Sequence, residues 1–429
     1  MSDLFLDNKI TKIAVIGLGY VGLPLALAFS RIYPTIGYDI SKTRIKQLIN
    51  GYDATLEVNT EQLLDSKLCK FTSDKKMLKE SNTYVITVPT PVKKSKKPDL
   101  THLISASKLV ASVLEINDVI IYESTVYPGV TEEICIPIIE KVSKLLLNKD
   151  FFVGYSPERV NPGDKLHRLE DIVKVTSGSN NNCADYIDHL YSTIIKAGTF
   201  KAKNIKTAEA AKVIENIQRD VNIALINELA ILFKKIGVST KNVLEAASTK
   251  WNFLNFKPGL VGGHCIGVDP YYLTYKAQEV NYEPELILAG RRLNDKMADY
   301  VSENLILELI KNNGLKSDFK ILLMGITFKE NCPDIRNTKA YDIYKYFKNI
   351  GINLDVYDPC ANSKDVLEKY NILLKDRLEC SNYDAIIIAV AHDIFKKMSY
   401  NCIKKLGNDK VLIYDLKYIF PDDVNCLRL

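Results

Sequence analysis

The stretch TKIAVIGLGYVGLPLALAF, residues 11–29, decides the fold of this chain. It begins with TKIAVI (11–16), a short apolar run rich in branched side chains, which is typical of a buried parallel strand. The pattern Gly17-Leu-Gly19-Tyr-Val-Gly22 follows at once, and a helix-like segment comes after it. A strand, a glycine turn and a helix in this order predict the start of a parallel, doubly wound α/β sheet.

The three glycines at these spacings predict a dinucleotide-binding turn. Gly17 allows the tight turn, Gly19 lets the backbone approach a pyrophosphate, and Gly22 lets the helix pack closely on the strand. The helix N-terminus then faces the phosphates, and the intervening Tyr20 and Val21 are assigned to the same cofactor site. The structural alternative is a turn that needs glycine only for its backbone conformation.

An acidic residue, Asp39, ends the second predicted strand, 34–39. A carboxylate at this place accepts both ribose hydroxyls and repels a 2′-phosphate, so it favours NAD over NADP as the cofactor. Lys42 and Arg44 lie close by in the sequence and leave NADP open. An ordinary helix cap is the structural alternative for Asp39.

Strands alternate with helical segments in two separate parts of the chain. The other predicted strands are 84–88, 118–122 and 151–155 in the first part, and 320–325, 353–359, 384–390 and 410–415 in the second. Between these parts, residues 207–236 lack Gly and Pro and have apolar side chains at helical spacing. They predict a long central helix, and a second long helix is expected at 285–312.

The predicted fold class is therefore α/β, with two Rossmann-like doubly wound domains joined by a helical middle domain with a long central helix. We expect an N-terminal NAD-binding domain at 1–203, a central domain at 204–312 and a C-terminal domain at 313–429.

Composition excludes several classes of protein. The 429 residues carry 57 basic and 52 acidic side chains, a balance that by itself implies neither a nucleic-acid nor a membrane partner. The nine cysteines are widely spaced without a Cys-x-x-Cys pair, and the five histidines are scattered. This usage predicts a reduced, cytoplasmic protein without a disulfide framework or a metal site.

One segment near the N-terminus resembles a targeting sequence. Residues 13–30 carry no charge, so a signal peptide or a membrane span is the alternative to a strand and a helix. The preceding residues mix acidic and basic side chains, and the glycines and Pro24 suit a turn better than a span. We therefore expect no membrane association.

A glycine-rich loop surrounds one cysteine: Gly259-Leu-Val-Gly262-Gly263-His264-Cys265-Ile-Gly267-Val-Asp269-Pro270. The glycines let the backbone approach a ligand and leave the thiol accessible. A thiolate can attack an aldehyde and hold it as a thiohemiacetal, provided that a neighbouring cation lowers the pKa of the thiol. A small buried side chain is the structural alternative for Cys265.

The long predicted helix offers a candidate for this cation. Lys212, Asn216 and Asp220 are spaced four residues apart and therefore share one face. In isolation such a face is typical of a solvated surface. Lys212 can serve the thiol only if the helix meets the cysteine loop.

With the glycine turn, the loop GGHCIGVDP and the helix sequence AEAAKVIEN, the whole chain resembles the UDP-glucose/GDP-mannose dehydrogenase family. Three stretches look most similar to bacterial UDP-N-acetylhexosamine 6-dehydrogenases that act on UDP-GlcNAc or UDP-GalNAc: SPERVNPGD (156–164), ENIQRDVNIALINEL (215–229) and KPGLVGGHCIGVDPYYL (257–273). The resemblance implies a homodimer through the central helix and a C-terminal domain that binds the UDP-sugar. It also implies four-electron oxidation of the sugar C6 hydroxyl to a carboxylate by two NAD and one water, for surface polysaccharide synthesis.

The resemblance also assigns roles to residues. Cys265 is expected to be the nucleophile, Lys212 and Asn216 to stabilise the oxyanion, and Asp269 to act with Lys212 in proton transfer. Thr125 and Glu158 are expected to position water. The remaining expected cofactor contacts are Thr90, Thr125 and Arg336, and the expected substrate contacts are Glu158, Arg159, Lys212, Asn216, Lys257, Gly262 and Lys329. Arg291, in the sequence AGRRLND, is a further candidate substrate contact through a phosphate or carboxylate, and a surface arginine on a helix is its structural alternative.

Three other functions remain open at this level. UDP-glucose or UDP-ManNAc could replace the expected substrate, because no residue here proves a contact with an N-acetyl group. A two-electron NAD-dependent hydroxyacid dehydrogenase needs neither Cys265 nor residues 318–429. A non-catalytic nucleotide-binding protein would have no need to retain Lys212, Asn216, Cys265 and Asp269.

Overall fold

The structure is a computed structural model that describes residues 11–93, 95–160, 168–263, 266–316, 318–421 and 423–429. The chain forms two compact units. Unit 1 comprises residues 1–215 and 271–283, and unit 2 comprises residues 216–270 and 284–429. Helices predicted for a middle domain at 204–312 are divided between these units, and the three-domain description remains a prediction.

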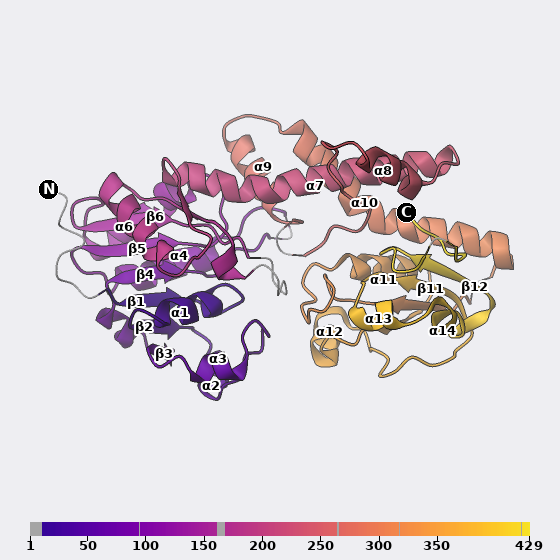
Figure 1. Ribbon diagram of the computed structural model, residues 1–429, viewed down its shortest axis with the longest axis horizontal. Helices are drawn as coiled ribbons and strands as arrows, with labels where there is room; N and C mark the ends of the chain where they lie inside the picture. Colours follow the sequence, from indigo (N-terminus) through magenta and orange to yellow (C-terminus); the bar gives the residue numbers. More distant parts are fainter. Residues whose placement is uncertain (1–10, 94, 161–167, 264–265, 317, 422) are drawn as a thin grey trace. The chain divides into compact units, whose positions relative to one another are not determined.

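Unit 1 is built on a six-stranded sheet whose strands are all parallel (Figure 1). The strand order is β3-β2-β1-β4-β5-β6, which confirms the predicted doubly wound topology. The strands are β1 (Ile13–Ile16), β2 (Thr35–Tyr38), β3 (Cys69–Thr72), β4 (Thr83–Ile86), β5 (Asp118–Tyr122) and β6 (Phe151–Tyr155). β3 was not predicted, because this edge strand is only partly buried and lacks an apolar run.

Helices cover both faces of this sheet. α1 (Gly22–Ser30) and α6 (Asn181–Ser192) bury their apolar side chains against one face, together with Val15, Val85 and Ile121. On the opposite face, α4 (Thr101–Ala111) packs on α5 (Ile136–Ser143), and the Ser107 hydroxyl bonds Tyr122 Oη over 2.7 Å. Two faces buried in this way explain why the central strands read as continuous apolar runs.

The remaining elements of unit 1 lie around this core. They are α2 (Lys42–Ile49), α3 (Thr60–Leu64), the 3₁₀ helices η1 (Lys75–Glu80) and η3 (Leu169–Asp171), the π-helical turn η2 (Thr131–Cys135), and a two-stranded parallel sheet of β7 (Lys174–Thr176) and β8 (Thr199–Lys201). Strands β7 and β8 were not predicted, because three-residue strands carry too little periodicity to stand out in the sequence.

Four helices form the middle of the chain: α7 (Ile205–Lys235), α8 (Thr240–Ser248), α9 (Asp269–Glu279) and α10 (Glu285–Asn313). α7 and α10 agree with the predictions at 207–236 and 285–312. The structural alternative of a solvated face on α7 is not found, because Lys212, Asn216 and Asp220 are only 8, 7 and 0% exposed. The division between the two units falls within α7 and close to the start of α9.

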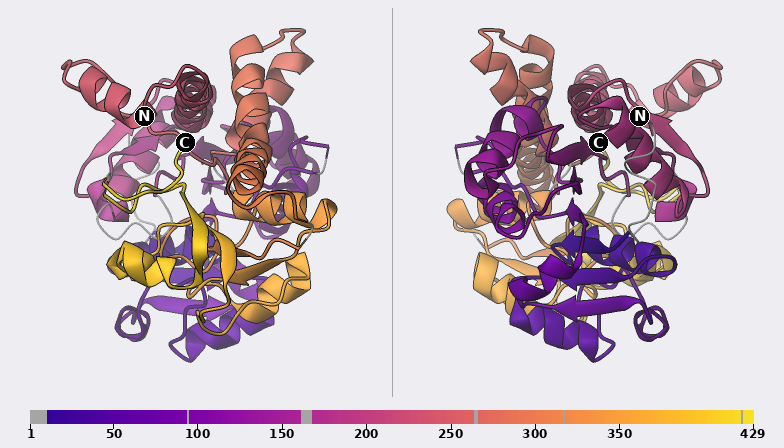
Figure 2. Two further views of the ribbon diagram at one scale, coloured as in Figure 1. Left: turned by 90° about the vertical axis from the view of Figure 1, so that its right-hand side faces the viewer. Right: turned by 90° about the vertical axis from the view of Figure 1, so that its left-hand side faces the viewer.

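The second sheet, in unit 2, has four parallel strands in the order β10-β9-β11-β12. These strands are β9 (Ile321–Met324), β10 (Leu354–Tyr357), β11 (Tyr383–Ile388) and β12 (Gly407–Asp415). α10 and α11 (Lys339–Asn349) pack together and bury one face of the sheet with α12 (Ser363–Tyr370) (Figures 1 and 2). α13 (Asp393–Lys397) and α14 (Tyr400–Lys404) cover the other face.

The apolar segment 13–30 forms β1, the glycine turn and α1, as predicted, rather than one continuous membrane-spanning or signal helix. Among the described residues, no helix is long and apolar enough to cross a membrane.

The glycine turn supplies a direct test of this packing. A Cβ on Gly22 would lie 1.8 Å from the Gly17 carbonyl oxygen and 2.4 Å from Thr87 Oγ1, whereas a Cβ on Gly19 would meet no atom within 4 Å. Gly22→Ala is expected to lower the free energy of unfolding by about 1–3 kcal/mol through overpacking. Gly19→Ala, the matched control, is expected to leave the urea midpoint unchanged. Equal midpoints for both variants would contradict this packing.

A second prediction concerns Glu209 on α7, whose side chain is fully buried and accepts hydrogen bonds from Gly129 N (2.6 Å) and Thr131 N (3.0 Å). Burial raises the pKa of this carboxyl to about 7 despite the two amide donors. The folded protein then holds the proton more tightly than the unfolded chain, so the free energy of unfolding falls as the pH rises from about 4.5 to about 7.

Glu209→Gln should remove this part of the pH dependence, and urea unfolding at several pH values measures it. Glu245→Gln, at an exposed site on α8, is the control and should keep the slope of the unaltered protein. Parallel curves for the unaltered protein and Glu209→Gln would contradict the assignment.

Candidate active site

The predicted site residues form two groups, one in each compact unit. In unit 1, Asp39 follows β2 and lies against the glycine turn. Its Oδ2 accepts a hydrogen bond from Leu18 N (2.9 Å), its Oδ1 accepts one from Ser41 N (2.8 Å), and the side chain is half-buried. Gly17 has φ +99° and donates to Tyr38 O (2.8 Å). The acidic residue and the tight turn therefore stand where a dinucleotide ribose and pyrophosphate would lie.

The nearby Arg44 is already engaged within the protein. Its Nε donates to Leu18 O (2.9 Å), and its guanidinium lies 2.8 Å from Asp53 Oδ1. Because Asp53 neutralises this cation, Arg44 would contribute little to binding the 2′-phosphate of NADP. The backbone at Gly19 is open, as close approach of a pyrophosphate requires. The described residues thus fit NAD, which would be held by Gly17, Gly19 and Asp39.

Two loops after β4 and β5 are joined by hydrogen bonds. Thr90 Oγ1 donates to Thr125 O (2.7 Å), and Ser124 Oγ donates to Val88 O (2.6 Å). Tyr272, at the other end of the unit's sequence, donates through its hydroxyl to Thr90 O. Thr90 and Thr125 are thereby fixed at the carboxyl edge of the sheet, where ligands of doubly wound folds bind.

A buried ion pair lies behind these loops and was not predicted. Lys174 Nζ lies 2.9 Å from Glu123 Oε2, the Tyr191 hydroxyl donates to Glu123 Oε1, and all three side chains are almost fully buried. Burial raises the pKa of Glu123, while Lys174 opposes that rise. A glutamate directly after a strand in the sequence was the available signal, but its partner Lys174 is 51 residues away.

The other predicted residues of unit 1 lie on the loop after β6 and on α7. Glu158 is 8% exposed, and its carboxylate accepts a hydrogen bond from Val160 N. Arg159 donates to Val173 O (2.8 Å) and pairs with Glu215 (2.8 Å). Lys212 is buried on α7, and no ion pair of its ammonium is found among the described residues.

A cavity of about 850 Å³ opens beside the glycine turn of unit 1. Its lining includes Tyr20, Val21 and Glu158, which the sequence assigned to cofactor or substrate binding, together with Asp53 and Asn59. The cavity therefore brings predicted cofactor and substrate residues to one place. This volume is within the usual range of a small-molecule site.

In unit 2, the predicted catalytic pair is in direct contact. Asn216 Nδ2 donates to Asp269 Oδ2 over 2.6 Å, and both side chains are buried. The loop that precedes Asp269 includes Cys265 and His264, both of which lie outside the described residues. The role of Cys265 therefore rests on the sequence and on its described neighbours.

Two described glycines before Cys265, Gly262 and Gly263, pack directly on the loop that follows β9. Gly263 N donates to Asn337 O (3.1 Å), and a Cβ on Gly262 would stand 2.7 Å from the same oxygen. Gly263 has φ +84°, and a Cβ there would stand 2.7 Å from the Phe328 ring. A side chain at either glycine would push the loop after β9 away. Close packing therefore explains two of the four glycines in the cysteine loop.

The predicted ligand contacts of the C-terminal half lie on or near this same loop. Lys329 is half-buried, and Lys257 is exposed. The guanidinium of Arg336 is 44% exposed and paired with Asp334. Lys329 and Arg336 are thus carried by one turn after β9, in agreement with a shared site, while their ligand contacts remain predictions.

Arg291 has a different environment from the one expected. Its side chain is 3% exposed and donates to Asp220 Oδ1 and Asp295 Oδ1, each over 2.6 Å. The carboxylate contacts expected of this arginine are therefore made within the protein, and its contact with a ligand remains a prediction. The fully buried Asp220 was its missed partner.

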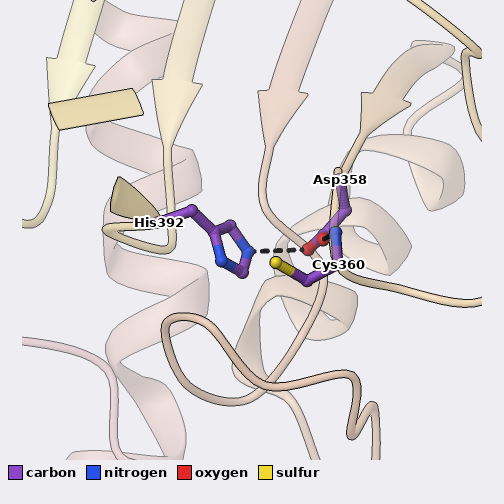
Figure 3. A group of neighbouring side chains, drawn as sticks. All are labelled: Asp358, Cys360 and His392. Carbon is purple, nitrogen blue, oxygen red and sulfur yellow. Dashed lines mark hydrogen bonds and ion pairs between the residues drawn. The ribbon is translucent and has the colours of Figure 1, made fainter. Parts of the chain in front are cut away.

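Asp358, Cys360 and His392 gather at the carboxyl edge of the second sheet (Figure 3), with potential ligand atoms within 4.8 Å of one another. Asn331 N donates to His392 Nδ1 (3.0 Å), so Nε2 carries the proton and donates to Asp358 Oδ2 (3.1 Å). Metal-bound histidines donate through their second nitrogen instead. Asp358 also accepts from Ile326 N (2.7 Å), and burial raises the pKa of Cys360 to about 11. This hydrogen bonding fits a structural brace better than a metal site.

Comparison with known proteins identifies all three parts of the chain. Residues 11–195, 206–296 and 322–422 match the NAD binding, central and UDP binding domains of the UDP-glucose/GDP-mannose dehydrogenase family. A UDP-N-acetyl-D-glucosamine 6-dehydrogenase of Salmonella typhi is 54% identical over 97% of this chain and 98% of its own length, and one of Pseudomonas aeruginosa is 53% identical over 98% and 100%.

A solved structure extends the comparison to the fold. The UDP-D-ManNAc dehydrogenase of Pyrococcus horikoshii superposes with a TM-score of 0.87 at 32% identity and covers 97% of this chain and 98% of its own. With the glycine turn and Asp39 in place, these matches show that the chain is an NAD-dependent oxidoreductase that belongs to the UDP-glucose/GDP-mannose dehydrogenase family.

Proposed function

We propose that the chain is a UDP-N-acetyl-D-glucosamine 6-dehydrogenase, which oxidises the C6 hydroxyl of its substrate to a carboxylate through a covalent intermediate on Cys265. The observation that carries this proposal is the identity of 54 and 53%, over nearly the full length, with two relatives that bear this activity in their names. The buried hydrogen bond from Asn216 to Asp269, which lies four residues after Cys265 in the sequence, supports it.

The first half of the reaction needs a base and an oriented alcohol. NAD supplies the hydride acceptor when bound. Asp269 is the proposed proton acceptor for the C6 hydroxyl, because Asn216 Nδ2 holds its carboxylate in one orientation (2.6 Å). Lys212 lies one helical turn before Asn216 on α7 and is the proposed cation for the developing oxyanion.

The second half needs a nucleophile, because an aldehyde has no hydride to give in a useful form. Addition of the Cys265 thiolate makes a tetrahedral alkoxide, which loses a second hydride and becomes a thioester; a second NAD would be the acceptor of this hydride. Water then breaks the C–S bond, giving the carboxylate and the free thiol. Glu158 and Thr125 are the proposed positioning groups for this water, and the covalent bond keeps the aldehyde from escaping.

The assembly and cellular setting are part of the same proposal. Ile214, Leu225 and Leu232 are 59, 54 and 49% exposed, and their spacing places them on one side of α7. This apolar row supports a homodimer through α7. The proposal also includes a cytoplasmic location, which the cysteine usage favours, and the domains 1–203, 204–312 and 313–429, which the sequence pattern favours. A role in surface polysaccharide synthesis is proposed from the family resemblance.

The covalent step predicts the electron count. The unaltered protein should form two NADH per UDP-N-acetyl-D-glucosamine, measured by absorbance with limiting sugar. Cys265→Ser should slow the second oxidation by about 1,000-fold or more while slowing the first far less, because only the second requires the thiolate. Cys402→Ser, at an exposed cysteine, is the control and should behave as the unaltered protein. A yield of two at an unchanged rate in Cys265→Ser would refute the covalent step.

The proposed substrate can be tested with a panel of four UDP-sugars. We expect kcat/KM for UDP-N-acetyl-D-glucosamine to exceed that for UDP-GalNAc, UDP-ManNAc and UDP-glucose by about 10-fold or more, since a pocket that pairs polar substituents discriminates strongly. Initial rates of NADH formation give these values. A higher value for UDP-glucose or UDP-ManNAc would assign the chain to another branch of the family.

A further inference from the structure

A buried asparagine on α7 holds both backbone groups of one residue in the cysteine loop. Asn227 Oδ1 accepts a hydrogen bond from Gly259 N (2.8 Å), and Asn227 Nδ2 donates to Gly259 O (3.0 Å). Asn227 is fully buried. A primary amide offers a donor and an acceptor side by side, so it matches the two groups of Gly259 in a way that neither a carboxylate nor an alkyl side chain can.

The orientation of this amide is fixed by a second layer of buried polar groups. Asn227 Nδ2 also donates to Asn294 Oδ1 (2.9 Å), and Asn294 Nδ2 donates to Asp220 Oδ1 (2.8 Å) and to Asp220 O (2.9 Å). Arg291 neutralises Asp220, with a guanidinium nitrogen 2.6 Å from Asp220 Oδ1. The nitrogen of Asn227 thus faces an oxygen on Asn294, which determines which side of the amide meets each group of Gly259.

The network continues to the start of α11. Asp295 accepts from Arg291 and lies 3.2 Å from Lys339 Nζ, which also pairs with Asp342 (2.9 Å). The backbone nitrogen of Lys339 would stand 3.2 Å from a Cβ on Gly262. The charged chain that supports Asn227 therefore reaches the same strip of backbone on which the cysteine loop packs.

Three separate contacts restrain the loop around position 265. Asn227 holds Gly259, Asn337 O accepts from Gly263 N (3.1 Å), and Asn216 holds Asp269 (2.6 Å). Cys265 lies two residues after Gly263 and four before Asp269. Two anchors come from separate points on α7 and the third from the turn before α11, and each holds a different residue of the loop.

We propose that Asn227 is a positioning residue that sets where the cysteine loop starts and thereby where the Cys265 thiol meets the aldehyde. The inference rests on the proposed nucleophilic role of Cys265. Asp269, the proposed base of the first oxidation, is held separately by Asn216, so removal of the Asn227 side chain should affect the second half of the reaction selectively. Misplacement of a reacting group by about 1 Å can cost about 100-fold in rate.

The test uses full-length Asn227→Ala, with Asn222→Ala as the matched control. Asn222 lies on the same helix, and its half-buried side chain donates to Gln218 O (2.7 Å), one turn earlier on that helix. With limiting UDP-N-acetyl-D-glucosamine, Asn227→Ala should form the first NADH at a rate close to the control. It should form the second about 100-fold more slowly and release aldehyde that a carbonyl reagent captures. The rate at which iodoacetamide alkylates Cys265, followed by mass spectrometry, should differ from that of the unaltered protein in Asn227→Ala but not in Asn222→Ala.

A folded Asn227→Ala variant with two NADH per sugar, at rates within about twofold of the control, would overturn the inference. If alanine prevents folding, Asn227→Asp replaces it, because aspartate has the same shape but puts an acceptor oxygen in place of the donor to Gly259 O and Asn294 Oδ1. Loss of the second oxidation in that variant supports the inference, and retention overturns it. Cys265→Ser separates the failure of the two proposals. If an Asn227 variant and Cys265→Ser both keep the second oxidation, the covalent mechanism is refuted. If the Asn227 variant keeps it and Cys265→Ser loses it, only the role of Asn227 is refuted.

Discussion

The cysteine loop depends on a contact between two backbones. At Gly262 the chain comes so close to Asn337 O that a single added carbon would stand 2.7 Å away, and Gly263 donates to the same oxygen over 3.1 Å. Only residues without side chains allow this approach, which explains why glycine occupies these positions. Everything proposed for Cys265 depends on this contact, because it ties the nucleophile's loop to the turn that carries Lys329 and Arg336. Through Gly262 and Gly263, the loop is fixed to the turn on which two of the expected ligand contacts lie.

The chain uses the same α/β unit twice, with different outcomes for one acidic residue. Asp39 after β2 accepts a hydrogen bond from Leu18 N, the residue after Gly17, and Asp358 after β10 accepts from Ile326 N, the residue after Gly325. Asp39 stays half-buried, so its carboxylate remains accessible to ribose hydroxyls. Asp358 is buried and also accepts from Thr327 N and His392 Nε2. The carboxylate stays accessible for the expected dinucleotide in the first unit, whereas in the second it braces the sheet edge.

The fold was predictable from the sequence where the physical signal is local. Buried parallel strands read as continuous apolar runs, and a helix of 31 residues without Gly or Pro is unmistakable. The short edge strand β3 and the pair β7–β8 were missed, because their residues are few and partly exposed. The site followed the same rule. Gly17 and Asp39 were predicted from their spacing and Asn216 from the family resemblance, whereas Asn227 and the Lys174–Glu123 pair act through partners 32 and 51 residues away. No single-sequence pattern reports contacts of that separation.

The most direct measurement is a crystal structure of Cys265→Ser, a variant that stalls before covalent attachment, with NAD and UDP-N-acetyl-D-glucosamine bound. The account predicts that the side-chain oxygen at position 265 and the nicotinamide C4 each lie within about 3.5 Å of the sugar C6, the separation of a near-attack geometry. A substrate whose C6 lies beyond about 6 Å from that oxygen, with NAD correctly seated on the glycine turn, would contradict the account, because no bond could then form at this residue.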